Sequence, residues 1–202
     1  MPSLDSCFET LKTLLREESV LRHRGDDPVF YLVFPPERTL QVKRKIDAWA
    51  VQLKLAGYEV TVCSAARIMN DVLRAHPNRD LWLDVEAHDL DLSDAYDREQ
   101  ITHTLRDVLA SDGAQQGAFE AHLQRTLATL KDRSSAQVLL LTDLEAIHPY
   151  FRIGALEQRL KGQFHVPTIV LYPGRRHGEF SLSFLGITTV DGNYRSTHVD
   201  CE

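Results

Sequence analysis

The chain has 202 residues, of which 43% are hydrophobic and 26% are charged, and its formal net charge is -6. A chain of this length and composition can bury a core without disulfides or metals, so it predicts a single domain covering 1–202. The acidic balance argues against a protein whose main task is to grip a phosphate backbone, because such domains carry a basic excess. Direct nucleic-acid binding is therefore not the leading expectation.

Cysteine spacing and hydropathy bear on the cellular compartment. Cys7, Cys63 and Cys201 form neither a CxxC pair nor an even-numbered framework, and we expect them to be reduced thiols. No cationic start with an apolar run opens the chain, and no apolar stretch approaches the length of a membrane span. These features predict a cytoplasmic protein with no membrane contact.

The first elements are a helix and a strand. Leu4, Phe8, Leu11 and Leu15 recur at helical spacing, which predicts an amphipathic helix near the start of the chain. The apolar run VFYLVF at 29–34 is too short for a helix of its own. It predicts a strand that is buried on both faces.

A second helix, a second strand and a third helix follow. The prolines after Phe34 end the first strand, and helical periodicity resumes at Thr39 and stops at Gly57. The run YEVTVCS (58–64) then predicts a strand, and AARIMNDVLRA (65–75) predicts a helix. This alternation of strands and helices predicts parallel pairing of the strands.

The second half of the chain contains an irregular stretch and then more strands. Residues 80–132 are acidic at first and then show helical periodicity, which predicts a helical insertion. The runs at 138–143 and 168–174 predict buried strands on either side of a helix around 150–160. Two short strands, around FSLSFLG and NYRSTHV, are expected to finish the sheet.

This order of elements predicts an α/β fold: a three-layer sandwich with a largely parallel sheet, plus the helical insertion. The layout resembles a nucleotide-hydrolase core. In such sheets ligands bind beyond the carboxyl ends of the strands. The segments to test are therefore those after Phe34, Ser64, Thr142 and Tyr172.

The segment FPPERTLQVKRK (34–45) stands where a phosphate-binding loop would stand, between a first buried strand and a helix. Such a loop needs glycines that turn backbone N–H groups inward and a lysine at the helix start. Prolines remove N–H donors, and Lys43, Arg44 and Lys45 lie too far into the helix to meet phosphates. We therefore expect a core without a phosphate-binding loop, no cofactor, and a solvated basic helix face.

Asp143 follows a buried strand, at the position where an acid can hold magnesium in nucleotide hydrolases. Without a phosphate-binding loop this acid has no phosphates to serve. Residues of this type also accept N–H hydrogen bonds at helix starts. The favoured interpretation is that Thr142 or Asp143 caps the next helix.

The acidic stretch at 84–97 carries oxygen ligands and a histidine but matches no known metal loop. It lacks the central glycine of a calcium loop, and His76, His88 and His103 fit no zinc spacing. A solvated surface without a metal is the expectation. The acids and the histidine in question are Asp84, Glu86, His88, Asp89, Asp91 and Asp94.

The loop YPGRRHGEF (172–180) is rich in hydrogen-bond donors. Arg175 and Arg176 are suited to bidentate binding of a phosphate or carboxylate. Two apolar runs separated by a turn that contains Gly178 nevertheless favour a β-hairpin. The sequence holds no GxSxG elbow and no other catalytic motif, so we assign no catalytic residue.

The run VPTIVLYPGRRHGEFSLSFLG followed by NYR, with LLLTDLEAIHPYFRIGALEQRL before it, resembles the BrxB family of BREX phage-defence systems. The whole chain follows the layout of that family. Where the family usually has a glycine-containing turn, this chain has Asp143, Leu144 and Glu145. The residues that carry the resemblance are Tyr172, Pro173 and Gly174, then Leu182, Phe184, Leu185 and Gly186, then Asn193, Tyr194 and Arg195, with Pro149 and Arg152.

The resemblance implies a role rather than a reaction. BrxB proteins are small components that act beside a large ATPase, a phosphatase-like protein called PglZ and a DNA methyltransferase. These systems modify host DNA and stop phage replication. We expect a non-catalytic adaptor that binds the PglZ-like protein, with the ATPase and the methyltransferase as further candidate partners. A homodimer is left open.

The partner contacts are expected among aromatic and arginine residues, since these types dominate interface energetics. The alternative is a nucleotide- or nucleic-acid-contacting regulatory protein that uses the basic loop after Tyr172 and the helix after Pro36. The predicted contacts are Tyr150, Phe151, Arg152, Tyr172, Arg175, Arg176, Tyr194 and Arg195.

Overall fold

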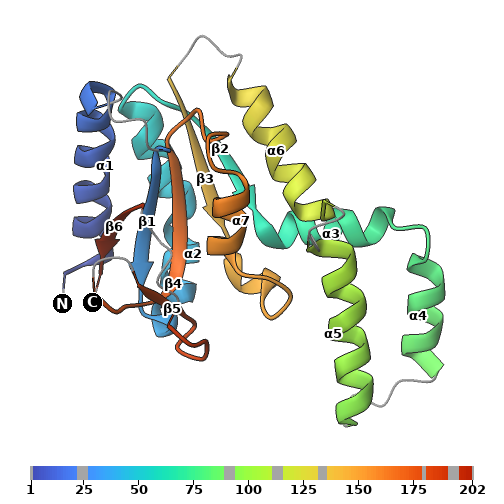
Figure 1. Ribbon diagram of the computed structural model, residues 1–202. Coiled ribbons are helices and arrows are strands. Elements are labelled where there is room, and N and C mark those ends of the chain that lie inside the picture. Colours follow the sequence, from blue (N-terminus) through green and yellow to red (C-terminus); the bar gives the residue numbers. More distant parts are fainter. Residues whose placement is uncertain are drawn as a thin grey trace.

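A computed structural model describes residues 2–21, 27–88, 94–110, 116–131, 136–178, 181–190 and 196–201. Within these residues, a six-stranded sheet has the order β2-β3-β4-β1-β6, with β5 paired to β4 off this path (Figure 1). The strands are β1 (Val29–Phe34), β2 (Glu59–Ser64), β3 (Gln137–Thr142), β4 (Thr168–Arg176), β5 (Leu182–Phe184) and β6 (Thr197–Asp200).

The described helices lie between and around these strands. They are α1 (Leu4–Leu21), α2 (Thr39–Leu55), α3 (Ala65–Ala75), α4 (Arg79–His88), α5 (Ala95–Leu109), α6 (Ala118–Lys131) and α7 (Ile153–Arg159), with the 3-10 turns η1 (Pro36–Arg38) and η2 (Leu144–Ile147). Within the described parts of the chain, no helix has both the length and the apolar character that crossing a membrane requires.

The sheet is largely parallel, as predicted. Strand β1 pairs in parallel with β4 and β6, and β3 pairs in parallel with β2 and β4. The carboxyl ends of these strands therefore meet at one edge, which lies at the bottom of Figure 1. The α/β sandwich with a largely parallel sheet is confirmed.

The predicted hairpin at this edge is also confirmed, although its first strand is longer than predicted. Strand β4 continues past Gly174 to Arg176 and pairs antiparallel with β5, with Arg175 opposite Ser183. The close pairing explains the glycine, because a Cβ at Gly174 would lie 2.2 Å from the carbonyl oxygen of Ser183. Gly178 has the positive φ of 84° that turns between strands often need.

Helices α1 and α2 cover one face of the sheet. Their apolar side chains pack on alternate residues of the strands, and the rings of Phe8 and Trp49 stack with centroids 4.6 Å apart. The buried strand residues on this face include Phe30, Leu32 and Leu140. The apolar stripes read from the sequence thus form the first of two cores.

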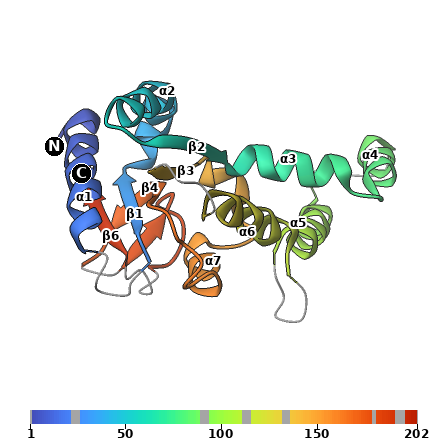
Figure 2. The same cartoon turned by 90° about the horizontal axis from the view of Figure 1, so that it is seen from above.

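Helices α6 and α7 cover the opposite face, and Figure 2 shows α2 and α7 on opposite sides of the sheet. The second core contains Phe119, Leu123 and Leu127 of α6 packed with Tyr31 and Leu139 of the strands. The range 80–132 holds helices throughout its described parts. Its last helix, α6, packs on the sheet.

Helices α3, α4 and α5 extend away from the sheet, to the right in Figure 1. The hydroxyl of Ser64, the last residue of β2, accepts a hydrogen bond from the N–H of Arg67 and so caps α3. Asp94 caps α5 by accepting from the N–H of Tyr96 at 2.6 Å. We call α3, α4 and α5 together the helical arm.

Candidate functional site

The carboxyl edge of the sheet holds a polar cluster built from four elements, β2, β3, α2 and η2. Ser64 ends β2, and its register partner Thr142 ends β3, so the two hydroxyls lie side by side. Asp143 follows directly and accepts hydrogen bonds from Ser64 Oγ at 2.6 Å and Thr142 Oγ1 at 2.8 Å. Lys43 of α2 reaches over this edge, with its Nζ 2.9 Å from Asp143 Oδ1 and in contact with Glu145 Oε1.

The capping role predicted for Asp143 is wrong. Asp143 stands at the start of η2 with a left-handed backbone, φ 58° and ψ 37°, and its side chain makes no capping hydrogen bond. One carboxylate oxygen faces Lys43 and the other accepts from the two hydroxyls. The basic face predicted for α2 is exposed at Lys43 and Arg44, and Lys43 is in addition ion-paired to the sheet edge.

Burial and pairing set the charge of this cluster. Burial by itself would raise the pKa of Asp143, but hydrogen bonds from Ser64, Lys43 and Thr142 hold that pKa below its ordinary value. Burial would lower the pKa of Lys43, yet its contacts with Glu145 and Asp143 raise that pKa overall. Both groups are therefore charged at neutral pH and neutralise each other.

This cluster occupies the place where a nucleotide hydrolase would hold phosphate and magnesium. Here η1 follows β1 directly and begins at Pro36, and the ammonium of Lys43 lies against the carboxylates of Asp143 and Glu145. In the described parts of the chain, no group of three or more His, Cys, Asp or Glu side chains could hold a metal ion. The geometry is that of an internal ion-pair network that ties α2 to η2.

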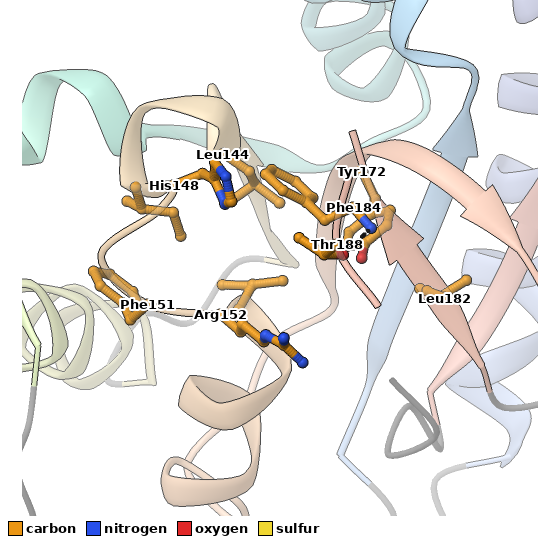
Figure 3. Close-up of a pocket in the computed structure, with 10 residues that line it drawn as sticks. Leu144, His148, Phe151, Arg152, Tyr172, Leu182, Phe184 and Thr188 are labelled. Carbon is orange, nitrogen blue, oxygen red and sulfur yellow. Dashed lines mark hydrogen bonds between the residues drawn. The ribbon is translucent and has the colours of Figure 1, made fainter. Parts of the chain in front are cut away.

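An apolar hollow lies beside the cluster, between the η2–α7 segment and the β4–β5 hairpin (Figure 3). The rings of His148 and Phe184 face each other across it with centroids 5.9 Å apart. Tyr172 of β4 and Leu144 of η2 also line it. Its free volume of about 20 Å³ has room for about one water molecule, so a nucleotide would not fit.

The predicted contact residues around this hollow differ in exposure. Tyr172 is 1% exposed and makes edge-to-face contacts with Tyr31 and Phe184, so its ring lies in the core rather than on the surface. Phe151 is half-buried and packs edge-on against Phe119, with ring centroids 5.1 Å apart. Tyr150 is also half-buried, and burial raises the pKa of its phenol.

The predicted arginines lie on the surface near the same edge. Arg152 is exposed and donates from Nη2 to Thr189 Oγ1 at 3.3 Å. Arg175 is exposed, with Nη2 3.9 Å from Glu37 Oε1, and Arg176 donates from Nε to the carbonyl oxygen of Gly178 at 2.7 Å. The remaining predicted contacts, Tyr194 and Arg195, lie outside the described residues.

The structure also contains a surface that the sequence reasoning missed. An apolar groove of about 600 Å³ lies between the three helices of the helical arm. Leu81 and Leu83 of α4 line this groove and are 60% and 47% exposed. The available signal was the run Leu81, Trp82, Leu83 in an otherwise acidic stretch, where no helical period assigns a buried face.

The acids of that stretch are only partly described. Asp84 and Asp94 are exposed, the side chains of Glu86 and His88 are not placed, and Asp89 and Asp91 lie outside the described residues. Asp94 serves as the cap of α5.

Comparison with known proteins identifies the family. The family model described as "BREX protein BrxB" matches residues 71–199, which include the end of α3 and the elements from α4 to β5. No curated protein and no solved structure matches the chain. The matched range covers well over half of the chain, so it carries the family assignment. The chain belongs to the BrxB family and is a component of a BREX phage-defence system.

Proposed function

We propose that the chain is a non-catalytic adaptor of a BREX assembly that binds the PglZ-like phosphatase-fold component. The observation that carries the proposal is the ion pair of Lys43 with Asp143 and Glu145. It lies at the carboxyl edge of the sheet, where an α/β enzyme binds its substrate. There it pairs one ammonium and two carboxylates with one another, which supports a structural role for these three groups.

The adaptor role is supported by the surface that remains exposed. Exposed apolar side chains on the helical arm, such as Leu81 and Leu83, are of a residue type that interfaces use. The BREX ATPase and DNA methyltransferase act in the same assembly and are further candidate partners. The cytoplasm is the compartment in which the adaptor would meet them.

The alternative, a nucleotide- or nucleic-acid-contacting protein, has less support. It relies on the basic loop after Tyr172, where Arg175 faces Glu37 and Arg176 donates to a backbone carbonyl. The neighbouring hollow is too small for a base or a phosphate group. A protein that contacts phosphates would bind DNA or an ATP analogue with a steep salt dependence.

The test is co-expression of the chain with the PglZ-like protein of the same BREX system, followed by size-exclusion chromatography with light scattering at moderate and high salt. We expect a stoichiometric complex that survives high salt, since apolar burial is not screened. Independent elution at both salts would overturn the choice of partner.

A paired variant separates the adaptor from the alternative. Replacing both Arg175 and Arg176 by alanine is expected to leave the complex intact. The affinity of the chain for DNA should be the same in this variant as in the wild type. The exposed pair Arg125 and Lys131 of α6, also replaced by alanine, serves as a control of equal charge change outside the loop after Tyr172 and the helix after Pro36. Salt-sensitive DNA or ATP-analogue binding by the wild type that only the Arg175/Arg176 variant abolishes would establish the alternative.

A further inference from the structure

The groove of the helical arm is formed by side chains from three helices. Leu73 of α3, Trp82 of α4 and Ile101 and Leu105 of α5 supply most of its apolar lining. Ile101 and Leu105 are one helical turn apart and therefore lie on one face of α5. The result is an open apolar surface between three helices rather than a closed cavity.

The apolar side chains of this groove are not covered in the way that those of the core helices are. Leu81 and Leu83 are 60% and 47% exposed, whereas Leu123 and Leu127 of α6 are 0% and 1% exposed. The ring of Trp82 stacks on His76 with centroids 4.2 Å apart, which fixes one wall. A contiguous exposed apolar surface of this kind is typical of a protein-binding site.

Among the described residues that line the groove, the charged side chains are those of Arg74 and Arg79, and none carries a carboxylate. Arg74 donates from Nε to Asn70 Oδ1 at 3.1 Å, and Arg79 pairs at 2.8 Å with the outward-facing Asp80. In a chain with a net charge of -6, this basic margin points to an occupant that carries negative charge beside an apolar face.

We propose that the groove binds an amphipathic α-helix of a BREX partner protein, with the apolar face of that helix against Trp82, Ile101 and Leu105 and its flanking carboxylates toward Arg74 and Arg79. The volume of about 600 Å³ accommodates several apolar side chains. A helix bound in a groove inserts several apolar side chains that are spaced three or four residues apart. The identification of the partner as a BREX component rests on the proposed adaptor function. The groove itself does not depend on which component binds.

The first experiment places a charge in the groove without touching the core. Leu81→Glu and Leu83→Glu alter exposed side chains that line the groove, so both variants are expected to fold. Leu40→Glu and Leu55→Glu are matched controls, since these leucines of α2 are 69% and 84% exposed and lie outside the groove. Co-expression with the PglZ-like protein should give a complex about tenfold weaker or more for the groove variants only.

A second experiment tests the occupant with a defined probe and the full chain. The probe is a designed leucine-faced helix flanked by glutamates, and its counterpart is flanked by lysines. Trp82 lines the groove, whereas Trp49 is 1% exposed in the core. Binding of the acidic probe should shift the tryptophan fluorescence, and this shift should vanish in Trp82→Phe. In Arg74→Glu/Arg79→Glu, the affinity for the acidic probe should fall about tenfold.

The outcomes separate the two proposals. A wild-type complex that neither Leu81→Glu nor Leu83→Glu weakens would overturn the groove as the docking site and leave the adaptor function standing. Absence of any wild-type complex would overturn the partner, and the fluorescence experiment would still decide the groove. Equal binding of both probes, or a dimer of the chain that Leu83→Glu dissolves, would overturn an acidic partner helix.

Discussion

The carboxyl edge of the sheet and the helical arm differ in how far their charged and apolar side chains are paired or covered within the chain. At the edge, the charges of Lys43, Asp143 and Glu145 meet each other, and the aromatic rings of Tyr172 and Phe184 pack together. On the arm, apolar side chains such as Leu81 have no comparable cover. The charges and rings at the edge have partners within the chain, whereas Leu81 and Leu83 on the arm remain exposed to solvent.

The difference shows why position in an α/β fold is a poor guide to function by itself. Ligands usually bind at the carboxyl edge of such sheets, and the sequence directs attention to that edge. Here the ion pairs and hydrogen bonds at the edge link α2, β3 and η2 to one another. The surface that still lacks a partner lies on helices that extend away from the sheet (Figures 1 and 2).

The largest effect should come from a residue that the sequence places at the edge and the structure places in the core. Tyr172→Ala should lower the free energy of unfolding by about 3–5 kcal/mol, because it removes a buried ring. Tyr150→Ala, at a half-buried neighbour, should cost about 1 kcal/mol. Urea unfolding of both variants measures the difference. Similar small losses would mean that Tyr172 is a surface residue.

Breaking the ion-pair network should have an intermediate effect. Lys43→Ala leaves two carboxylates facing each other, but the side chain of Lys43 is 39% exposed, so solvent limits the loss to about 1–2 kcal/mol. Adding Asp143→Asn and Glu145→Gln to Lys43→Ala should restore part of that stability. A double-mutant cycle with no coupling between Lys43 and the acids would contradict the ion-pair network described above.

The same network predicts a pH dependence. The pKa of Asp143 in the folded chain lies below its unfolded value of 3.8. The resulting stabilisation is complete above that unfolded value and is lost as the pH falls through the folded pKa. Between about pH 6 and about pH 3, the wild type should therefore lose more stability than Asp143→Asn. The measurement is urea unfolding of both proteins at the two pH values. An equal loss of unfolding free energy in the wild type and in Asp143→Asn would argue against a charged Asp143.

The smallest effect on stability should come from the helical arm. Leu83→Glu changes a side chain that is 47% exposed, so the free energy of unfolding should change by about 0.5 kcal/mol or less. The measurement is thermal or urea unfolding of the isolated chain beside Leu55→Glu. A loss of several kcal/mol would show that the arm groove is covered by the chain itself.

Much of the fold follows from local patterns in the sequence. The continuous apolar runs at 29–34 and 138–143 and the helical stripe from Thr39 predict elements that the structure contains. These signals are visible because burial acts on side chains a few residues apart. The resemblance to the BrxB family, drawn from the sequence, is confirmed by a family model that matches residues 71–199.

The candidate site was much less predictable. Asp143 makes its contacts with Ser64 and Lys43, which belong to distant parts of the chain, so no local pattern distinguishes this network from a helix cap. The groove is missed for a different reason. Leu81, Trp82 and Leu83 are consecutive, so together they do not mark one face of a helix, and Leu81 and Leu83 are exposed.

The most direct test of the account is hydrogen–deuterium exchange of the full chain, alone and in complex with its BREX partner. If the groove of the helical arm is the docking site, the partner should slow amide exchange in 70–83 and 100–105, the segments that contribute its lining residues. The exchange rates of 143–152 and 175–176 should stay the same. Protection of the sheet-edge segments with no change on the helical arm would contradict the account and return the interface to the carboxyl edge.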